Sequence, residues 1–136
     1  MPLTIFTDGA FRISRRLGFG WVALNKGRIC GEACGPVDND GSNNFAAEVW
    51  AVLEALRWAY AQGHREVEIC TDFESMPKHF ARRFPVEQSY AARLFDWLGQ
   101  HPELKVSVRK VSGRTPLHER AHQLSQTGAG LRAQAA

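Results

Sequence analysis

The stretch GFGWVALNKGRICGEACG, residues 18–35, contains two short apolar runs separated by Asn-Lys-Gly. Asn25 and Gly27 suit the positive backbone dihedral angles of a tight turn, so the stretch predicts a β-hairpin. Residues 2–7 form another apolar run, and an arginine-rich connection over residues 8–17 separates this run from the hairpin. The first part of the chain therefore predicts three antiparallel strands in a meander.

The rest of the chain alternates between helical and extended patterns. A polar, turn-rich loop over residues 36–43 leads into a helix predicted for residues 43–61, and Gly63 suits its C-terminal cap. Further elements are predicted in this order: a strand at 66–72, helical segments within 74–99 that are interrupted near Pro85, a strand at 104–111 and a helix at 117–127. This order predicts a mixed α/β domain, in which a meander is followed by crossover units.

Length and composition favour one packed domain over residues 1–136, with residues 129–136 as a frayed tail. No apolar run is long enough to predict a membrane span, and no basic segment followed by a long apolar one predicts a secretion signal. The three cysteines do not form a disulfide framework pattern, which favours reduced thiols and a cytoplasmic location.

The charge balance is mildly basic, with a net charge of +3 and an isoelectric point near 9.0. This balance permits nucleic-acid binding without requiring it. Arg12, Arg15 and Arg16 form one basic cluster, which is either a solubilising surface or a site that binds a polyanion.

Two aspartates stand at the ends of predicted strands: Asp8 ends the first strand and Asp72 ends the fourth. Ligands of α/β sheets gather at the carboxyl ends of neighbouring parallel strands, so these carboxylates would face each other if their strands are adjacent. Two unpaired carboxylates at short range repel, and a divalent cation between them removes the repulsion. Oxygen ligands favour Mg²⁺ or Mn²⁺.

Glu48 is a third candidate acid, near the start of the long predicted helix and within the apolar segment FAAEVW. A carboxylate in such a segment is unusual unless it is paired or binds a metal ion. A favourable interaction with the N-terminal end of the helix dipole is an equally simple explanation.

Taken together, the segments IFTDGAF, SNNFAAEVWAVLEALRWA and VEICTDFESM resemble type 1 ribonuclease H, in this order and over nearly the whole chain. The resemblance implies the ribonuclease H-like fold, which is a five-stranded mixed sheet with a three-stranded antiparallel meander and two parallel strands, flanked by helices. It also implies that Asp8, Glu48 and Asp72 are catalytic carboxylates that bind metal ions.

The segment HERAHQLSQ, residues 118–126, departs from the family because it places His122 where the family has a fourth acid. The resemblance implies a catalytic and metal-binding role for His122, whereas a surface histidine on an amphipathic helix is the alternative. A neutral imidazole should hold Mg²⁺ more weakly than a carboxylate does and should favour Mn²⁺.

Substrate contacts are also expected to differ from the family. Arg114 stands near the place of a loop histidine of the family and is expected to contact phosphate, whereas His118 fits the start of the last helix better. The segment of residues 74–100 is too short for the basic protruding helix of many ribonuclease H family members. Substrate binding is therefore expected to be weaker, or to depend on the Arg12, Arg15 and Arg16 cluster.

The function implied by the resemblance is endonucleolytic hydrolysis of the RNA strand of an RNA–DNA hybrid by a monomer with two Mg²⁺ or Mn²⁺ ions, giving 5′-phosphate and 3′-hydroxyl ends. Asp8 would bridge the two ions, Glu48 would bind one of them near the 2′-hydroxyl, and Asp72 would lie on the side of the attacking water with His122. Asn43 and Asn44 are candidates for minor-groove contacts, and they also suit a loop and a helix cap.

Three other functions stay open at this point. The domain could bind hybrids or structured RNA with weak or no cleavage. The presence of Asp8, Glu48 and Asp72 argues against this, because unpaired buried carboxylates are costly without a metal ion. It could be a related metal-dependent nuclease that acts on DNA, because one fold supports several nucleases. It could also be a structural domain of a larger assembly.

Overall fold

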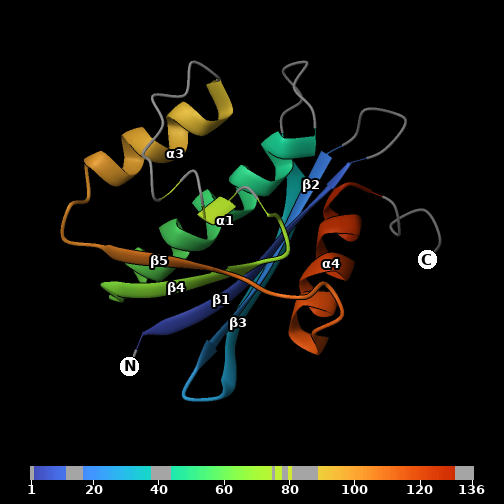
Figure 1. Cartoon of the computed structure of the whole chain (residues 1–136), viewed down its shortest axis with the longest axis horizontal. Coiled ribbons are helices and arrows are strands. Elements are labelled where there is room, and N and C mark those ends of the chain that lie inside the picture. Colours follow the sequence, from blue (N-terminus) through green and yellow to red (C-terminus); the bar gives the residue numbers. More distant parts are fainter. Residues whose placement is uncertain are drawn as a thin grey trace.

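The computed structural model describes residues 2–11, 17–37, 44–74, 76–77, 80 and 89–130 (Figure 1). Arg12, Arg15, Arg16 and Asn43 lie outside these ranges, as do residues 131–136 of the predicted tail. The described elements are β1 (Leu3–Phe11), β2 (Leu17–Asn25), β3 (Arg28–Val37), α1 (Asn44–Ala61), β4 (Glu66–Thr71), α3 (Ser89–Gly99), β5 (Lys105–Lys110) and α4 (Pro116–Gly128).

The strands form one sheet in the order β3-β2-β1-β4-β5. β1, β2 and β3 pair antiparallel, and β4 pairs parallel with both β1 and β5. This confirms the predicted fold class, in which a three-stranded meander continues into two parallel strands. It also confirms the condition for the acidic site, because the strands that carry Asp8 and precede Asp72 are neighbours.

The first strand is longer than predicted. β1 continues to Phe11, and Asp8 pairs with Gly20 of β2 inside the antiparallel ladder. The expectation that Asp8 ends the first strand was therefore wrong, because a polar residue in an apolar run does not stop backbone pairing. In the turn between β2 and β3, the positive φ angles belong to Lys26 (53°) and Gly27 (79°) rather than to Asn25.

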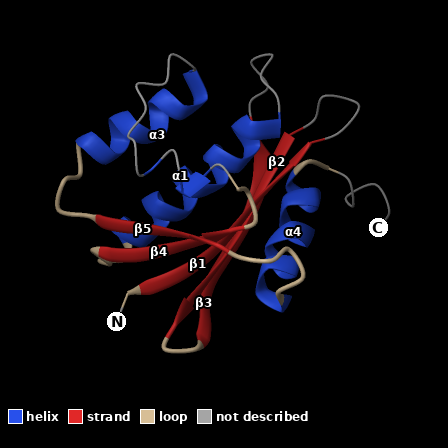
Figure 2. Ribbon diagram, viewed as in Figure 1, coloured by secondary structure: helices blue, strands red, loops and turns tan. Residues whose placement is uncertain are grey.

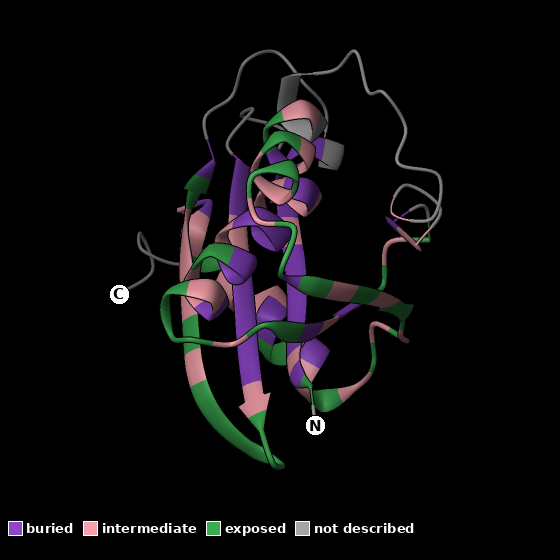
Figure 3. Cartoon of the chain, turned by 90° about the vertical axis from the view of Figure 1, so that its left-hand side faces the viewer, coloured by how far each residue is buried: buried purple, intermediate pink, exposed green. Residues whose placement is uncertain are grey.

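The helices cover opposite faces of the sheet: α1 and α3 lie on one side and α4 lies on the other (Figure 2). The larger core lies between the sheet and α1, with fully buried residues such as Ile5, Leu53 and Ile69. A smaller cluster under α4 contains Phe6 and Cys70. The central strands are accordingly the most buried part of the sheet (Figure 3).

Alternation along β1 decides which face each side chain takes. Phe6 packs under α4, so Asp8, two residues later, points to the same face.

Within the described part of the chain, no helix has both the length and the apolar character to cross a membrane.

Candidate active site

Two glycines let the helices approach the sheet on either side of Asp8. A Cβ atom on Gly9 would lie 2.4 Å from the backbone of Ala47 and Glu48 in α1. A Cβ atom on Gly20, the register partner of Asp8, would lie 2.5 Å from the Ala121 oxygen and the Ser125 nitrogen in α4. These close approaches need glycine, and they bring side chains of α1 and α4 to Asp8.

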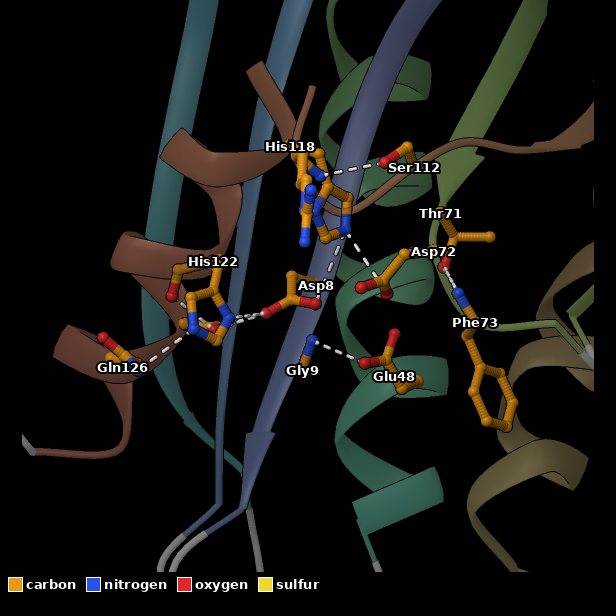
Figure 4. A network of polar contacts seen from close by, with 12 residues as sticks. Asp8, Gly9, Glu48, Thr71, Asp72, Phe73, Ser112, His118, His122 and Gln126 are labelled. Atoms are coloured by element: carbon orange, nitrogen blue, oxygen red, sulfur yellow. Dashed lines mark hydrogen bonds and ion pairs between the residues drawn. The ribbon is translucent and has the colours of Figure 1, made fainter. Parts of the chain in front are cut away.

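Asp8 is the centre of the polar network in Figure 4 and is only 3% exposed. Its Oδ2 accepts hydrogen bonds from His122 Nδ1 (2.8 Å) and Ser125 Oγ (2.9 Å). Its Oδ1 lies 3.5 Å from His118 Nε2. Burial raises the pKa of Asp8, and the hydrogen bonds from His122 and Ser125 oppose this shift.

Glu48 reaches the site from the opposite face of the sheet. Its Oε1 accepts a hydrogen bond from the Gly9 backbone nitrogen (3.1 Å), while its buried Oε2 has no hydrogen-bond partner among the described residues. Burial and the nearby Asp8 charge raise the pKa of Glu48 well above the usual carboxyl range. Because the first turn of α1 contains no acid, the helix-dipole explanation loses its support, since that effect fades beyond the first turn.

Asp72 follows β4 and is the more accessible aspartate, with 39% of its side chain exposed. Its Oδ1 lies 3.4 Å from His118 Nε2. Contact with His118 lowers the pKa of Asp72, whereas burial opposes this shift. The structure therefore brings Asp8, Glu48 and Asp72 together, as predicted.

His118 was not predicted as a site residue from the sequence. It belongs to the start of α4, as expected, but its side chain is buried and points between Asp8 and Asp72 (Figure 4). Burial lowers the pKa of His118, yet the carboxylates of Asp72 and Asp8 outweigh burial and raise it. The spacing of His118 and His122 was the available signal, because residues four apart share one face of a helix.

His122 contacts Asp8, so it is not a free surface histidine even though 44% of its side chain is exposed. Its Nε2 lies 3.1 Å from the side-chain nitrogen of Gln126. A carboxylate only accepts hydrogen bonds, so Nδ1 carries the proton that is donated to Asp8, and Nε2 accepts from Gln126. This tautomer is assigned from the hydrogen-bond network.

Among the predicted substrate-binding residues, Arg114 is exposed in the loop between β5 and α4. This loop lies against Asp72, because a Cβ atom on Gly113 would be 3.0 Å from Asp72 Oδ2. Asn44 begins α1, and its side chain is not among those described. Arg12, Arg15, Arg16 and Asn43 also lie outside the described residues, so their roles stay predictions.

The donor atoms at this site fit a divalent cation. Asp8, Asp72 and His118 each offer one ligand atom, and these atoms all lie within 4.8 Å of one another. The unpaired Oε2 of Glu48 adds a buried acceptor close by. Buried acceptors without donors are costly, and a bound cation would compensate them.

Residues 6–111 match the family model described as reverse transcriptase-like. Among curated proteins, none matches the chain significantly.

Three solved structures illustrate the likeness in fold. Ribonuclease H1 of the halophilic archaeon Halobacterium salinarum NRC-1 has a TM-score of 0.76 at 21% identity, covering 96% of this chain and 98% of that one. The N-terminal ribonuclease H domain of a Mycobacterium tuberculosis protein has a TM-score of 0.80 at 18% identity, covering 98% and 97%. LC11 ribonuclease H1, solved in complex with an RNA/DNA hybrid, has a TM-score of 0.78 at 20% identity, covering 94% and 96%.

The family model spans most of the chain, and the similar structures match its fold over nearly their whole length. The chain therefore belongs to the reverse transcriptase-like family and has the fold of ribonuclease H, as its resemblance predicted.

Proposed function

We propose that this protein is a metal-dependent endoribonuclease that hydrolyses the RNA strand of RNA–DNA hybrids and leaves 5′-phosphate and 3′-hydroxyl ends. The observation that carries the proposal is the meeting of Asp8, Glu48 and Asp72, with one buried oxygen of Glu48 unpaired among the described residues. The similar LC11 enzyme in complex with an RNA/DNA hybrid supports this class of substrate.

Asp8, Glu48 and Asp72 would hold the divalent ions, either Mg²⁺ or Mn²⁺, and His122 is the fourth residue that the family resemblance adds to this set. Two such ions, if bound, would supply the activation of a water molecule and the stabilisation of the leaving 3′ oxygen. Oxygen donors suit both ions, so the carboxylates alone do not select between them.

The residues around the ions would position the reactants. His122 and Ser125 orient Asp8 by donating to the same oxygen, Oδ2. The partly exposed Asp72 marks the open side of the site, where a phosphate would approach. Arg114, in the loop beside Asp72, would contact that phosphate, and its charge would favour the bound polyanion.

The remaining contacts to the hybrid would come from residues whose placement was predicted from the sequence. Asn43 and Asn44 would lie against the minor groove, where the 2′-hydroxyl distinguishes RNA from DNA. Arg12, Arg15 and Arg16 would contact the phosphate backbone. A monomeric state and a cytoplasmic location stay predictions.

A second candidate function is a hybrid-binding module that does not cleave. The position of His118 favours it, because a protonated imidazole between Asp8 and Asp72 would neutralise these carboxylates without a metal ion. Removal of metal ions by a chelator distinguishes the two functions. Chelation would abolish cleavage by a nuclease, whereas it would leave hybrid binding by a binding module unchanged.

The test of substrate class uses duplexes of one sequence, RNA–DNA, RNA–RNA and DNA–DNA, with each strand labelled separately. We expect cleavage only of the RNA strand in the hybrid, only with added Mg²⁺ or Mn²⁺, and with products that a ligase can join because they carry a 5′-phosphate and a 3′-hydroxyl. Metal-dependent cutting of the DNA duplex would instead show a nuclease of different specificity. Binding of the hybrid without cutting would support the binding module.

A further inference from the structure

Two histidines of α4 reach Asp8 but differ in what their ring nitrogens contact. His118 and His122 lie about one helical turn apart, and both face the site (Figure 4). Both nitrogens of His122 are engaged, since Nδ1 donates to Asp8 at 2.8 Å and Nε2 lies 3.1 Å from the amide nitrogen of Gln126. This ring has no nitrogen left for another ligand unless these contacts break.

The ring of His118 is placed differently. It is 1% exposed, and neither of its nitrogens makes a hydrogen bond of good geometry among the described residues, although the Gly113 backbone and the Asp72 carboxylate lie close to the ring. Its Nε2 lies between Asp72 Oδ1 at 3.4 Å and Asp8 Oδ1 at 3.5 Å. A buried imidazole that is aimed at two carboxylate oxygens without forming a good hydrogen bond to either suits a site that a cation shared with these oxygens would complete.

The two distances from His118 Nε2 to the carboxylate oxygens suit a shared metal ion better than direct hydrogen bonds. Good hydrogen bonds between nitrogen and oxygen are shorter, at about 2.7–3.2 Å. Two donor atoms that bind one ion at about 2.1 Å lie about 3.0–3.4 Å from each other, because the angle at the ion is between about 90° and 110°. Small movements of His118 would therefore complete a site with two oxygens and one nitrogen.

We infer that His118, rather than His122, is the nitrogen ligand of a divalent ion held with Asp8 and Asp72, and that the site prefers Mn²⁺ or Co²⁺ to Mg²⁺. A nitrogen donor favours the transition metals, whereas Mg²⁺ prefers oxygen. His122 is then a positioning residue that acts through Asp8. The inference rests on the proposed function for the identity of the site, but metal binding can be measured without any substrate.

The test compares Mn²⁺ bound to wild type, His118→Gln and His122→Asn in the absence of nucleic acid. Glutamine places an amide where Nε2 of His118 lies, and asparagine keeps a nitrogen donor where Nδ1 of His122 lies, so each variant preserves size and polarity. Pulsed electron paramagnetic resonance detects imidazole nitrogen coupled to the Mn²⁺ spin. Titration gives the affinities for Mn²⁺ and Mg²⁺.

We expect nitrogen coupling in wild type and in His122→Asn, and its loss in His118→Gln. The affinity for Mn²⁺ should fall about tenfold or more in His118→Gln and less than about threefold in His122→Asn, while the affinity for Mg²⁺ changes little in either variant. Absence of nitrogen coupling in wild type would overturn the inference and would leave His118 as a counter-cation for the two aspartates. If His118→Gln does not fold, coupling that disappears in His122→Asn would equally overturn it.

The two proposals fail in different ways. Hybrid cleavage by a protein whose bound Mn²⁺ shows no nitrogen coupling would keep the proposed function and remove His118 from the ligands. Nitrogen coupling that depends on His118, in a protein that cuts no hybrid, would keep the metal site and remove the proposed function.

Discussion

At the scale of single residues, Asp8 is a buried carboxylate with few ways to keep its charge. Burial disfavours the ionised form, and hydrogen bonds from His122 and Ser125 compensate only one of its two oxygens. The other oxygen faces His118. Strand pattern alone indicated that Asp8 and Asp72 would lie close together, and the resemblance to ribonuclease H added Glu48 to this group.

His118 could not be selected in the same way. A histidine near the start of a helix can point to solvent or to the sheet, and its direction depends on how α4 docks. That docking depends on contacts between segments far apart in the chain, such as the pair of hydrogen bonds from Arg120 in α4 to Glu32 in β3.

His122→Ala removes the donor that orients Asp8. We expect the cleavage rate to fall about tenfold, and most at low metal concentration, because a poorly oriented carboxylate is a weaker ligand. His122→Asp should improve the use of Mg²⁺, since it adds an oxygen donor. Rates measured across concentrations of Mg²⁺ and Mn²⁺ test both variants, and equal rates for His122→Ala and wild type at every concentration would contradict this role.

At the scale of elements, the site depends on how closely α1 and α4 approach the sheet. The glycines on β1 and β2 set these distances, and neither glycine was identified from the sequence as part of the site. The order and type of the described elements could be predicted because their periodicities are clear. The end of β1 could not, since Asp8 interrupts an apolar pattern while the backbone pairing continues to Phe11.

Gly20→Ala should separate α4 from the sheet, because the new Cβ would lie 2.5 Å from backbone atoms of α4. We expect a loss of about 1–3 kcal/mol in the free energy of unfolding, which is typical of overpacking, and a larger relative loss of cleavage because Asp8 loses its donors. Gly99→Ala is the matched control, since nothing lies within 4 Å of a Cβ atom there. Urea unfolding of both variants gives the comparison, and equal stability of the two would show that α4 is not seated as described.

At the scale of the whole molecule, the fold gathers acids from three elements into one partly buried place while the chain as a whole stays mildly basic. Such a concentration of carboxylates lowers stability when no cation is bound, because they repel and lose hydration. Asp8 and Glu48, whose pKa values are raised by burial, then hold their protons more tightly in the folded protein than in the unfolded chain.

This predicts an unusual pH dependence for the metal-free protein. The pKa of Glu48 is raised well above its ordinary value of 4.5, so the folded state binds this proton more tightly than the unfolded state. The contribution of Glu48 to stability therefore falls as the pH rises from 4.5 through the folded pKa. His118 adds to the same trend above its ordinary value of 6.5, since its pKa is also raised.

Glu48→Gln removes the charge and keeps an acceptor for the Gly9 backbone nitrogen. In the presence of chelator we expect this variant to be more stable than wild type near neutral pH, by about 1–3 kcal/mol, with a difference that shrinks toward acidic pH. Added Mn²⁺ should narrow the difference, because it stabilises the form that binds it better. Urea unfolding over this pH range is the measurement, and a variant that is less stable than wild type without metal would contradict the prediction.

The central claim is that the acids around Asp8 hold the metal ions for hybrid cleavage. It is tested most directly by single-turnover cleavage of an RNA–DNA hybrid by wild type and Asp8→Asn. Hybrid binding and unfolding are measured on the same samples. Asparagine keeps the shape of Asp8 and removes its charge. We expect metal-dependent cutting of the RNA strand by wild type, no detectable cutting by Asp8→Asn, and a variant that folds and still binds the hybrid. Cutting by Asp8→Asn at the wild-type rate would show that Asp8 does not hold the metal ions for cleavage.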